Sequence, residues 1–122
     1  MLIRKQSGDV ISLSNEDGIV LSMEEKESDG GICMTLKGKL VSESAHLIQD
    51  ELEAFISIGL SVNLNLKDVT YISPSVMFVL LNAQMLTDNY FQNSEFTLRS
   101  VPAPIYQSLY AQGITDQLLI ED

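Results

Sequence analysis

A serine-proline-serine run, Ser73-Pro74-Ser75, stands directly before the most apolar segment of the chain. A serine hydroxyl accepts hydrogen bonds from free backbone N–H groups at a helix start, and proline suits the first helical position because it has no N–H to satisfy. Ser75 then lies in the first turn, where unpaired N–H groups and the helix dipole favour a phosphate on its hydroxyl. The run therefore predicts a helix start at which Ser75 is a candidate phosphoacceptor, although serine is also common at helix starts without such a role.

Other residue types give little support for catalysis or for metal binding. His46 is the only histidine and Cys33 the only cysteine of the 122 residues, so neither a pair of imidazoles nor a pair of thiols exists. We expect Cys33 to be half-buried in a strand and His46 to lie on the flank of a helix. No glycine motif for phosphate binding is present, and Gly30-Gly31 is predicted to be a turn. We therefore expect no enzyme activity, no cofactor and no metal.

The chain is strongly acidic, with seventeen acidic and seven basic residues and a net charge of −10. This charge argues against nucleic acid or an anionic membrane as the main partner. The acidic clusters at residues 24–29, 50–53 and 121–122 are either solvated faces or a docking surface for a basic protein. Residues 76–81 form the longest apolar run, about a third of a membrane span, and the N-terminus has no apolar core of a secretory signal. With an unpaired cysteine, these features predict one cytoplasmic domain.

Hydrophobic periodicity predicts the order of the elements. From the N-terminus we expect a hairpin with strands at 10–13 and 19–21, a turn at 28–31 and a strand at 32–40. A helix capped by Ser42 and ending before Gly59 follows, then a strand at 61–66 and a helix at 74–89, which should be the most buried helix. The last elements are a strand at 95–99, a helix from Pro102 to Ala111, and a short helix or extended tail at 114–120.

The strands and helices alternate from residue 32 onwards, which predicts parallel strands joined by crossover helices. Within the strands, apolar residues alternate with polar ones such as Thr35, Asn63 and Asn65. Sheets covered on both faces usually lack such alternation. The sequence therefore predicts an α/β fold with a single mixed β-sheet, helices packed on one face, and a polar, accessible opposite face.

Several short motifs follow one another in an order typical of a known family. They are Gly38-Lys39-Leu40 before the first helix, Asn63-Leu64-Asn65-Leu66 with the expected turn Val69-Thr70-Tyr71-Ile72, Val101-Pro102 before the third helix, and Gly113-Ile114 with Leu118 and Ile120 near the end. Their order and spacing resemble the STAS domain, found in anti-sigma factor antagonists and at the cytoplasmic ends of sulfate transporters. The resemblance covers residues 21–120 and implies a single STAS-like domain over 1–122, with 1–20 as an extra N-terminal strand or hairpin.

The functional motif of that family, Asp-Ser-Ser/Thr-Gly, falls on Ser73, Pro74, Ser75 and Val76. The resemblance implies that Ser75 matches the residue phosphorylated by a partner kinase in the antagonists. Three of the four positions depart from the motif, and the acid often found after Gly-x-Leu is Val41 here. A β-branched Val76 in place of glycine is expected to crowd a kinase that binds the loop closely.

The resemblance implies a non-catalytic regulatory module that binds another protein, in the manner of a bacterial anti-sigma factor antagonist in signal transduction and transcription regulation. The expected partner is an anti-sigma factor with serine kinase activity or another signalling protein, and ATP would bind to that partner. Phosphorylation of Ser75 would release or exchange the partner. The predicted contact residues lie at the second helix start and at the end of the strand before the first helix: Ser73, Pro74, Val76, Met77, Gly38, Val41 and Ser42.

Two other functions remain open. The departures at Pro74 and Val76 favour a constitutive STAS adaptor in a stress-signalling or transporter-associated complex, without phosphorylation. A small-ligand carrier would instead hold an apolar molecule on the open side of the sheet or in a gap beneath the second helix, lined by Met77, Phe78 and Met85.

Two structural alternatives also remain open. The N-terminal hairpin either completes the sheet or pairs two chains as a homodimer. Tyr106 and Tyr110, four residues apart, either fill the core or mark a docking face of the third helix.

Overall fold

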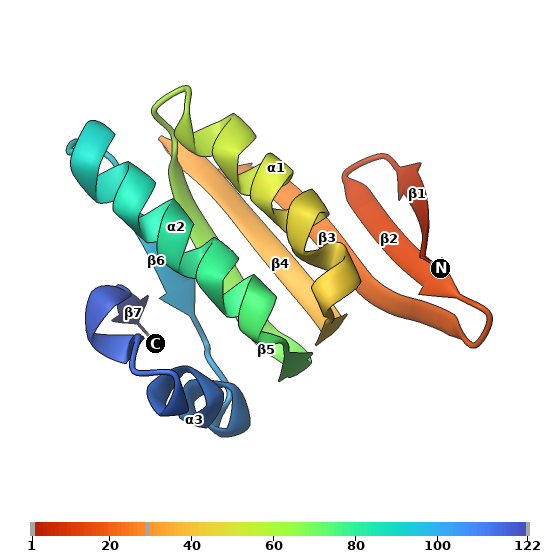
Figure 1. Cartoon of the computed structure of the whole chain (residues 1–122). Coiled ribbons are helices and arrows are strands. Elements are labelled where there is room, and N and C mark those ends of the chain that lie inside the picture. The colour runs from red at the N-terminus through yellow and green to blue at the C-terminus, as the bar shows by residue number, and fades with distance from the viewer. Residues whose placement is uncertain (1, 29, 122) are drawn as a thin grey trace.

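A mixed β-sheet with α-helices packed against it dominates the computed structural model, which describes residues 2–28 and 30–121 (Figure 1). The strands are β1 (Ile3–Ser7), β2 (Val10–Asn15), β3 (Gly18–Ser28), β4 (Gly31–Leu40), β5 (Ser61–Ile72), β6 (Phe96–Arg99) and β7 (Ile120–Glu121). The helices are α1 (Ala45–Ile56), α2 (Pro74–Tyr90) and α3 (Ala103–Ala111), with 3-10 turns at Ser42–Ser44 and Thr115–Gln117. Asp29 of the predicted turn and Asp122 of the acidic C-terminal cluster lie outside the described residues.

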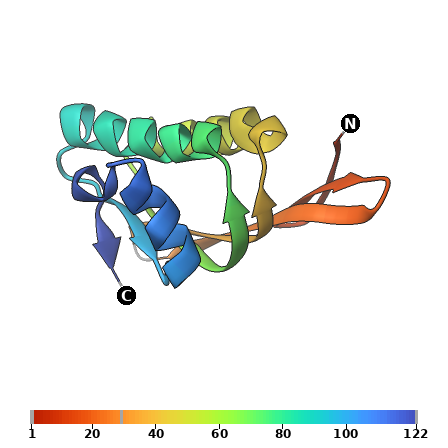
Figure 2. The same ribbon diagram turned by 60° about the horizontal axis from the view of Figure 1, so that its bottom comes forward.

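The order of the strands in the sheet follows their order in the chain, from β1 at one edge to β7 at the other. The pairs from β1 to β4 are antiparallel, and those from β4 to β7 are parallel. Each parallel pair is joined by a crossover through α1, α2 or α3, because parallel strands need such a connection. Figure 2 shows α1 and α2 side by side over one face of the sheet. The predicted single mixed sheet with helices packed on one face is therefore confirmed.

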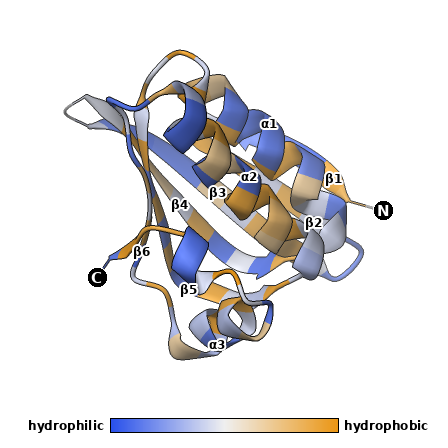
Figure 3. Ribbon diagram, turned by 60° about the vertical axis from the view of Figure 1, so that its left-hand side comes forward, coloured by the Kyte–Doolittle hydropathy of each residue, from blue (hydrophilic) through white to orange (hydrophobic). Residues whose placement is uncertain are grey.

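The core lies between the sheet and its helices. Val62, Leu64 and Leu66 of β5 point into it and are almost fully buried, whereas Asn63 and Asn65 between them are half-buried on the opposite face. This is the alternation expected of a strand with one covered face. Figure 3 shows apolar residues along α2, and buried ones such as Val76 and Leu80 belong to the same core.

Helix α2 contributes more buried residues than α1 or α3, as predicted. Its outer side, however, leaves Phe78 52% and Met85 50% exposed. Met77 is buried in the core, so Met77, Phe78 and Met85 do not face one enclosed space. The predicted lining of a small-ligand cavity is therefore wrong. Among the described helices, none has both the length and the apolarity to cross a membrane.

Two local predictions need correction. The residues 69–72 do not form a turn, because β5 continues to Ile72 and absorbs the extra residues through shifts of register against β4. Ser42 does not cap α1, because it begins the 3-10 turn that precedes the helix. Ser44 takes the cap position, and its hydroxyl donates to the carbonyl of Val41 at 2.6 Å instead of capping an N–H group.

The predicted N-terminal hairpin is present as β2 and β3, and β1 adds a further antiparallel strand. We call β1 and β2 the N-terminal ribbon. In Figure 2 the ribbon extends beyond the helices at one edge of the sheet, and β1 rises toward the level of α1. Ile11 and Leu13 of β2 are buried in the core cluster, and Leu2 packs against it. The ribbon thus extends the sheet past the flank of α1.

Candidate functional site

The start of α2 has the capping geometry that the sequence predicts. Ser73 has an extended backbone, and its Oγ accepts a hydrogen bond from the backbone N–H of Val76 at 3.3 Å. Pro74 follows at the first helical position. The backbone N–H of Ser73 also donates to the carbonyl of Leu40 at 2.8 Å. The helix start is therefore fixed both by its own cap and by the end of β4.

Ser75 is half-buried beside this cap, and Pro74 is exposed. The Oγ atoms of Ser73 and Ser75 lie 3.1 Å apart, so one hydroxyl donates to the other. Because Ser73 is only 2% exposed, Ser75 is the accessible member of this hydroxyl pair. A phosphate on Ser75 would lie at the positive end of the helix dipole, near N–H groups of the first turn.

The structure corrects part of the predicted contact surface at this helix start. Val76 and Met77 are buried, and Ser73 is nearly so, because these positions lie on the side of α2 that faces the sheet. Their side chains cannot contact a partner while the fold is intact. For the same reason Val76 adds no bulk at the surface, so the expected crowding of a kinase by its side chain does not apply. Pro74 and Phe78 are exposed at this end of the helix, and Ser75 is half-buried.

The sequence prediction named Phe78 in the lining of a small-ligand site and did not include it among the contact residues. It follows Pro74 and Ser75 by four and three residues, and this spacing places the three side chains on neighbouring positions of a helix surface. The exposure of Phe78 follows once the buried face of α2 is known. The sequence does not show which face that is, because α2 is apolar on most of its sides.

Gly38 has a structural reason to be glycine. Its φ angle is 106°, and a Cβ atom at this position would lie 2.2 Å from the carbonyl oxygen of Val20 on β3. The glycine therefore permits both a left-handed backbone and the close approach of β3 at a point where the register between β4 and β5 shifts. Its predicted role as a contact residue is limited to its backbone, because it has no side chain to offer.

The two predicted contact segments come together at one end of the sheet. Leu40 pairs with Ile72, so residues 38–42 lie next to the residues that open α2. Val41 is half-buried here and Ser42 is exposed. A hollow of about 470 Å³ adjoins them, and its lining comprises Asn15, Asp17, Gly18, Ile19, Val20, Gly38, Lys39, Val41 and Thr70. The turn between β2 and β3 thus belongs to the same region, which the sequence did not predict.

The residues considered for other chemistry lie apart. Cys33 is half-buried on the face of the sheet opposite to its buried neighbours Ile32 and Met34, and His46 is exposed on α1. Among the residues that the structure describes, no group of three or more histidine, cysteine, aspartate or glutamate residues is placed to hold a metal ion.

No family model matches the sequence, and no curated protein matches it. Solved structures match the fold. An anti-sigma factor antagonist from Mycobacterium paratuberculosis superimposes with a TM-score of 0.72 and 12% identity over 88% of this chain and 89% of that one. Unphosphorylated SpoIIAA, another anti-sigma factor antagonist, gives a TM-score of 0.67 and 11% identity over 82% and 88% of the two chains. The fold is the STAS fold.

The phosphorylated form of the Bacillus cell fate determinant SpoIIAA also matches, with a TM-score of 0.64, 11% identity, and coverage of 82% of this chain and 91% of that one. The predicted resemblance to the STAS fold of the anti-sigma factor antagonists is therefore confirmed for the architecture. At these identities the likeness concerns the STAS fold alone.

Proposed function

We propose that the protein is a non-catalytic regulatory module that binds a protein partner in the manner of an anti-sigma factor antagonist. The proposed contact surface consists of Pro74, Ser75 and Phe78 at the start of α2, with Val41 and Ser42 beside them. The observation that supports it most is the exposed start of α2: an accessible proline and serine and a half-exposed phenylalanine surround a well-capped helix end. The matching STAS structures are those of antagonists.

The proposed partner is an anti-sigma factor with serine kinase activity, which would supply the ATP. The net charge of −10 favours a partner with a basic contact surface, because opposite charges speed the encounter of two proteins. The protein would then regulate transcription in the bacterial cytoplasm, where sigma factors work.

Ser75 is the proposed phosphoacceptor. A phosphate adds about −1.5 to −2 charges at neutral pH. On Ser75 it would place them at the centre of the proposed contact surface and would replace the hydroxyl contact with Ser73. Binding would then weaken or pass to another partner. Structures of SpoIIAA in its unphosphorylated and phosphorylated forms both match this fold. This supports the proposal that a phosphate can be added without a change of architecture.

Binding can be tested with two variants of one helix. Phe78 and Met85 are equally exposed on α2, 52% and 50%, but only Phe78 lies beside the proposed surface. With an anti-sigma kinase from the same cells as immobilised partner, Phe78→Ala should weaken binding about tenfold or more, as expected for an aromatic contact residue. Met85→Ala should leave binding unchanged. Equal effects of the two substitutions, or none, would contradict the proposed surface.

Phosphorylation needs its own experiment, with the same kinase, ATP and mass spectrometry to locate the phosphate. We expect phosphate on the unsubstituted chain and on Ser57→Ala, whose serine is exposed at the end of α1, but none on Ser75→Ala. Binding without phosphate on any serine would favour the second function, a constitutive STAS adaptor. Pro74 supports that alternative, because it is exposed where the family motif has a hydroxyl and it makes the acceptor segment rigid.

A further inference from the structure

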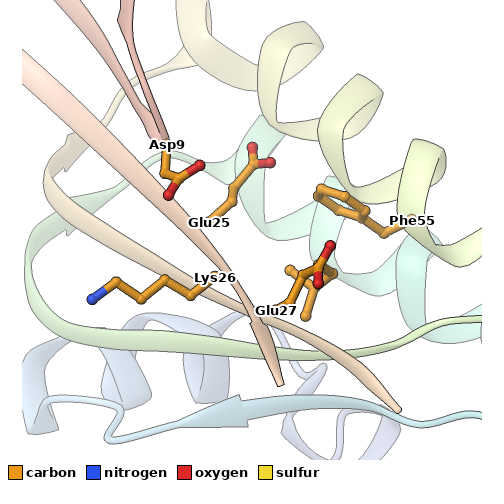
Figure 4. A pocket seen from close by; sticks show the side chains of 6 residues that line it. Asp9, Glu25, Lys26, Glu27 and Phe55 are labelled. Carbon is orange, nitrogen blue, oxygen red and sulfur yellow. The ribbon is translucent and has the colours of Figure 1, made fainter. Parts of the chain in front are cut away.

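The helix-facing side of β3 changes from apolar to acidic along the strand. Leu21 and Met23 are buried in the core, and the next two positions on the same side are Glu25 and Glu27. Figure 4 shows the Glu25 side chain pointing toward α1 between Asp9 and Phe55, while Lys26 points away. A hollow of about 590 Å³ lies here, lined by Asp9, Glu25, Lys26, Glu27, Ile32 and Phe55.

Glu25 meets a second carboxyl group across this gap. Its side chain lies within hydrogen-bond reach of Glu51 on α1. Its Oε1 atom is buried and, among the described residues, has no conventional donor as a partner. Two ionised carboxylates cannot hydrogen bond to each other, but a single proton between them supplies the missing donor.

Charged groups from every neighbouring element surround this carboxyl pair. Arg4 of β1 forms an ion pair with Glu51 at 3.7 Å, which ties the N-terminal ribbon to α1. Asp9, in the turn of the ribbon, accepts the backbone N–H of Glu25 through its carbonyl at 3.0 Å, and its carboxylate is a nearby negative charge. Of the remaining charged residues on β3, Glu27 shares the side of Glu25, whereas Glu24 and Lys26 pair with each other at 3.1 Å.

We propose that a proton shared between Glu25 and Glu51 holds β1 and β3 against α1, and that loss of this proton loosens β1. With the proton in place, the cluster is a chain from Glu25 through Glu51 to Arg4. Without it, two negative carboxylates face each other beside Asp9, and a single arginine offsets them.

The electrostatics of the cluster set the pH at which the proton is lost. Burial, the hydrogen bond to Glu51 and the charge of Glu51 raise the pKa of Glu25 from 4.5 to about 7, although Arg4 acts in the opposite direction. Glu25 is therefore mostly protonated below about pH 6 and mostly ionised above about pH 8. A pair of neighbouring carboxyl groups that shares one proton is the expected source of such a shift.

Strand β1 is the part that should move. All five residues of β1 are exposed, and β1 pairs with β2 alone. Helix α1, in contrast, is held by Ile48, Leu52 and Ile56, which are almost completely buried in the core. When the carboxyl pair repels, β1, which is weakly packed, yields before the helix does.

Amide hydrogen exchange at pH 6 and pH 8, corrected for the intrinsic pH dependence of exchange, tests this inference on the full chain. We expect the protection of the β1 amides to fall about threefold or more from pH 6 to pH 8. Glu25→Gln, which cannot ionise, should keep the protection at both values. Glu24→Gln, its neighbour on the opposite side of β3, should behave like the unsubstituted chain. Unchanged protection between the two pH values, or a fall that persists in Glu25→Gln, would overturn the inference.

A second measurement does not depend on any variant folding. Carboxyl carbon chemical shifts should show Glu25 titrating near pH 7, whereas a midpoint near 4.5 would overturn the inference. Neither measurement involves Ser75 or a partner, so their outcome is independent of the proposed function.

Discussion

The two halves of the sheet place different side chains beneath their helices. In the parallel half, inward positions are apolar, and Leu64, Leu66 and Leu98 are fully buried. In the antiparallel half, the same alternation leads to Glu25 and Glu27 on β3, and beyond them to an exposed β1. One half therefore owes its stability to apolar burial, and the other depends partly on charge. Protonation or salt should affect only the second half strongly.

This difference can be measured by removing apolar volume from each half. Leu64→Ala should lower the free energy of unfolding by about 4 kcal/mol, because β5 is central and its surroundings cannot collapse into the cavity. Leu13→Ala on the ribbon should cost about 2 kcal/mol, because the nearby edge of the sheet can relax. Urea unfolding of both variants measures the two values. A larger loss for Leu13→Ala would reverse the comparison.

The junction between the halves should be nearly as sensitive. Gly38→Ala should lower the free energy of unfolding by about 3 kcal/mol, because it combines a left-handed backbone with a Cβ atom 2.2 Å from the Val20 carbonyl oxygen. Gly18→Ala is the matched control: its φ is 119°, but no atom lies within 4 Å of the added Cβ. It should cost about 1 kcal/mol from backbone strain alone. Thermal unfolding of the two variants separates backbone strain from the steric clash with Val20. Equal losses of stability would show that the clash contributes nothing.

The charged half should show its dependence on pH in global stability. The pKa of Glu25 is higher in the folded protein, about 7, than its ordinary value of 4.5, so the folded state binds more protons between these values. The contribution of Glu25 to the free energy of unfolding is therefore present at low pH and falls as pH rises from about 4.5 to about 7.

Urea unfolding across this range compares the unsubstituted chain with two variants. Glu25→Gln should remove that part of the pH dependence, and Glu24→Gln should leave it unchanged. Identical pH profiles for all three proteins would show that Glu25 titrates normally.

The smallest effect is expected at the start of α2, in the parallel half. Ser73→Ala removes the side-chain cap of the Val76 N–H group and should cost about 1 kcal/mol. Ser75→Ala removes only a hydroxyl contact with Ser73 and should cost less than about 0.5 kcal/mol. Chemical unfolding of both variants gives the order. A greater loss of stability for Ser75→Ala than for Ser73→Ala would show that Ser73 is not the main cap of α2.

Most of the architecture could be predicted, because alternation and capping are local properties of the sequence. Val62, Leu64 and Leu66 indicated both the strand and its buried face, and Ser73 with Pro74 fixed the start of α2. The end of β5 was missed, because its register shifts against β4 and breaks the alternation. β1 was also missed, since its residues are all exposed and show no apolar face.

The surface was harder to predict than the core. Phe78, Tyr106 and Tyr110 are large and apolar but remain exposed, and composition alone does not show this. For Tyr106 and Tyr110 the sequence left both a core position and a docking face open. Their exposure depends on which side of each helix meets the sheet. The approach of Glu25 to Glu51 was equally hidden, because β3 and α1 are separated by β4 in the chain and meet only in the fold.

The order of the strands in the sheet favours folding during synthesis on the ribosome. Each strand finds its partner in the strand made immediately before it, so no early segment has to wait for a distant one. The antiparallel pairs can form first, while the crossover helices are still being synthesised. The sheet can therefore grow in one direction during translation, because the last strand formed leaves a free edge with which the next strand can pair.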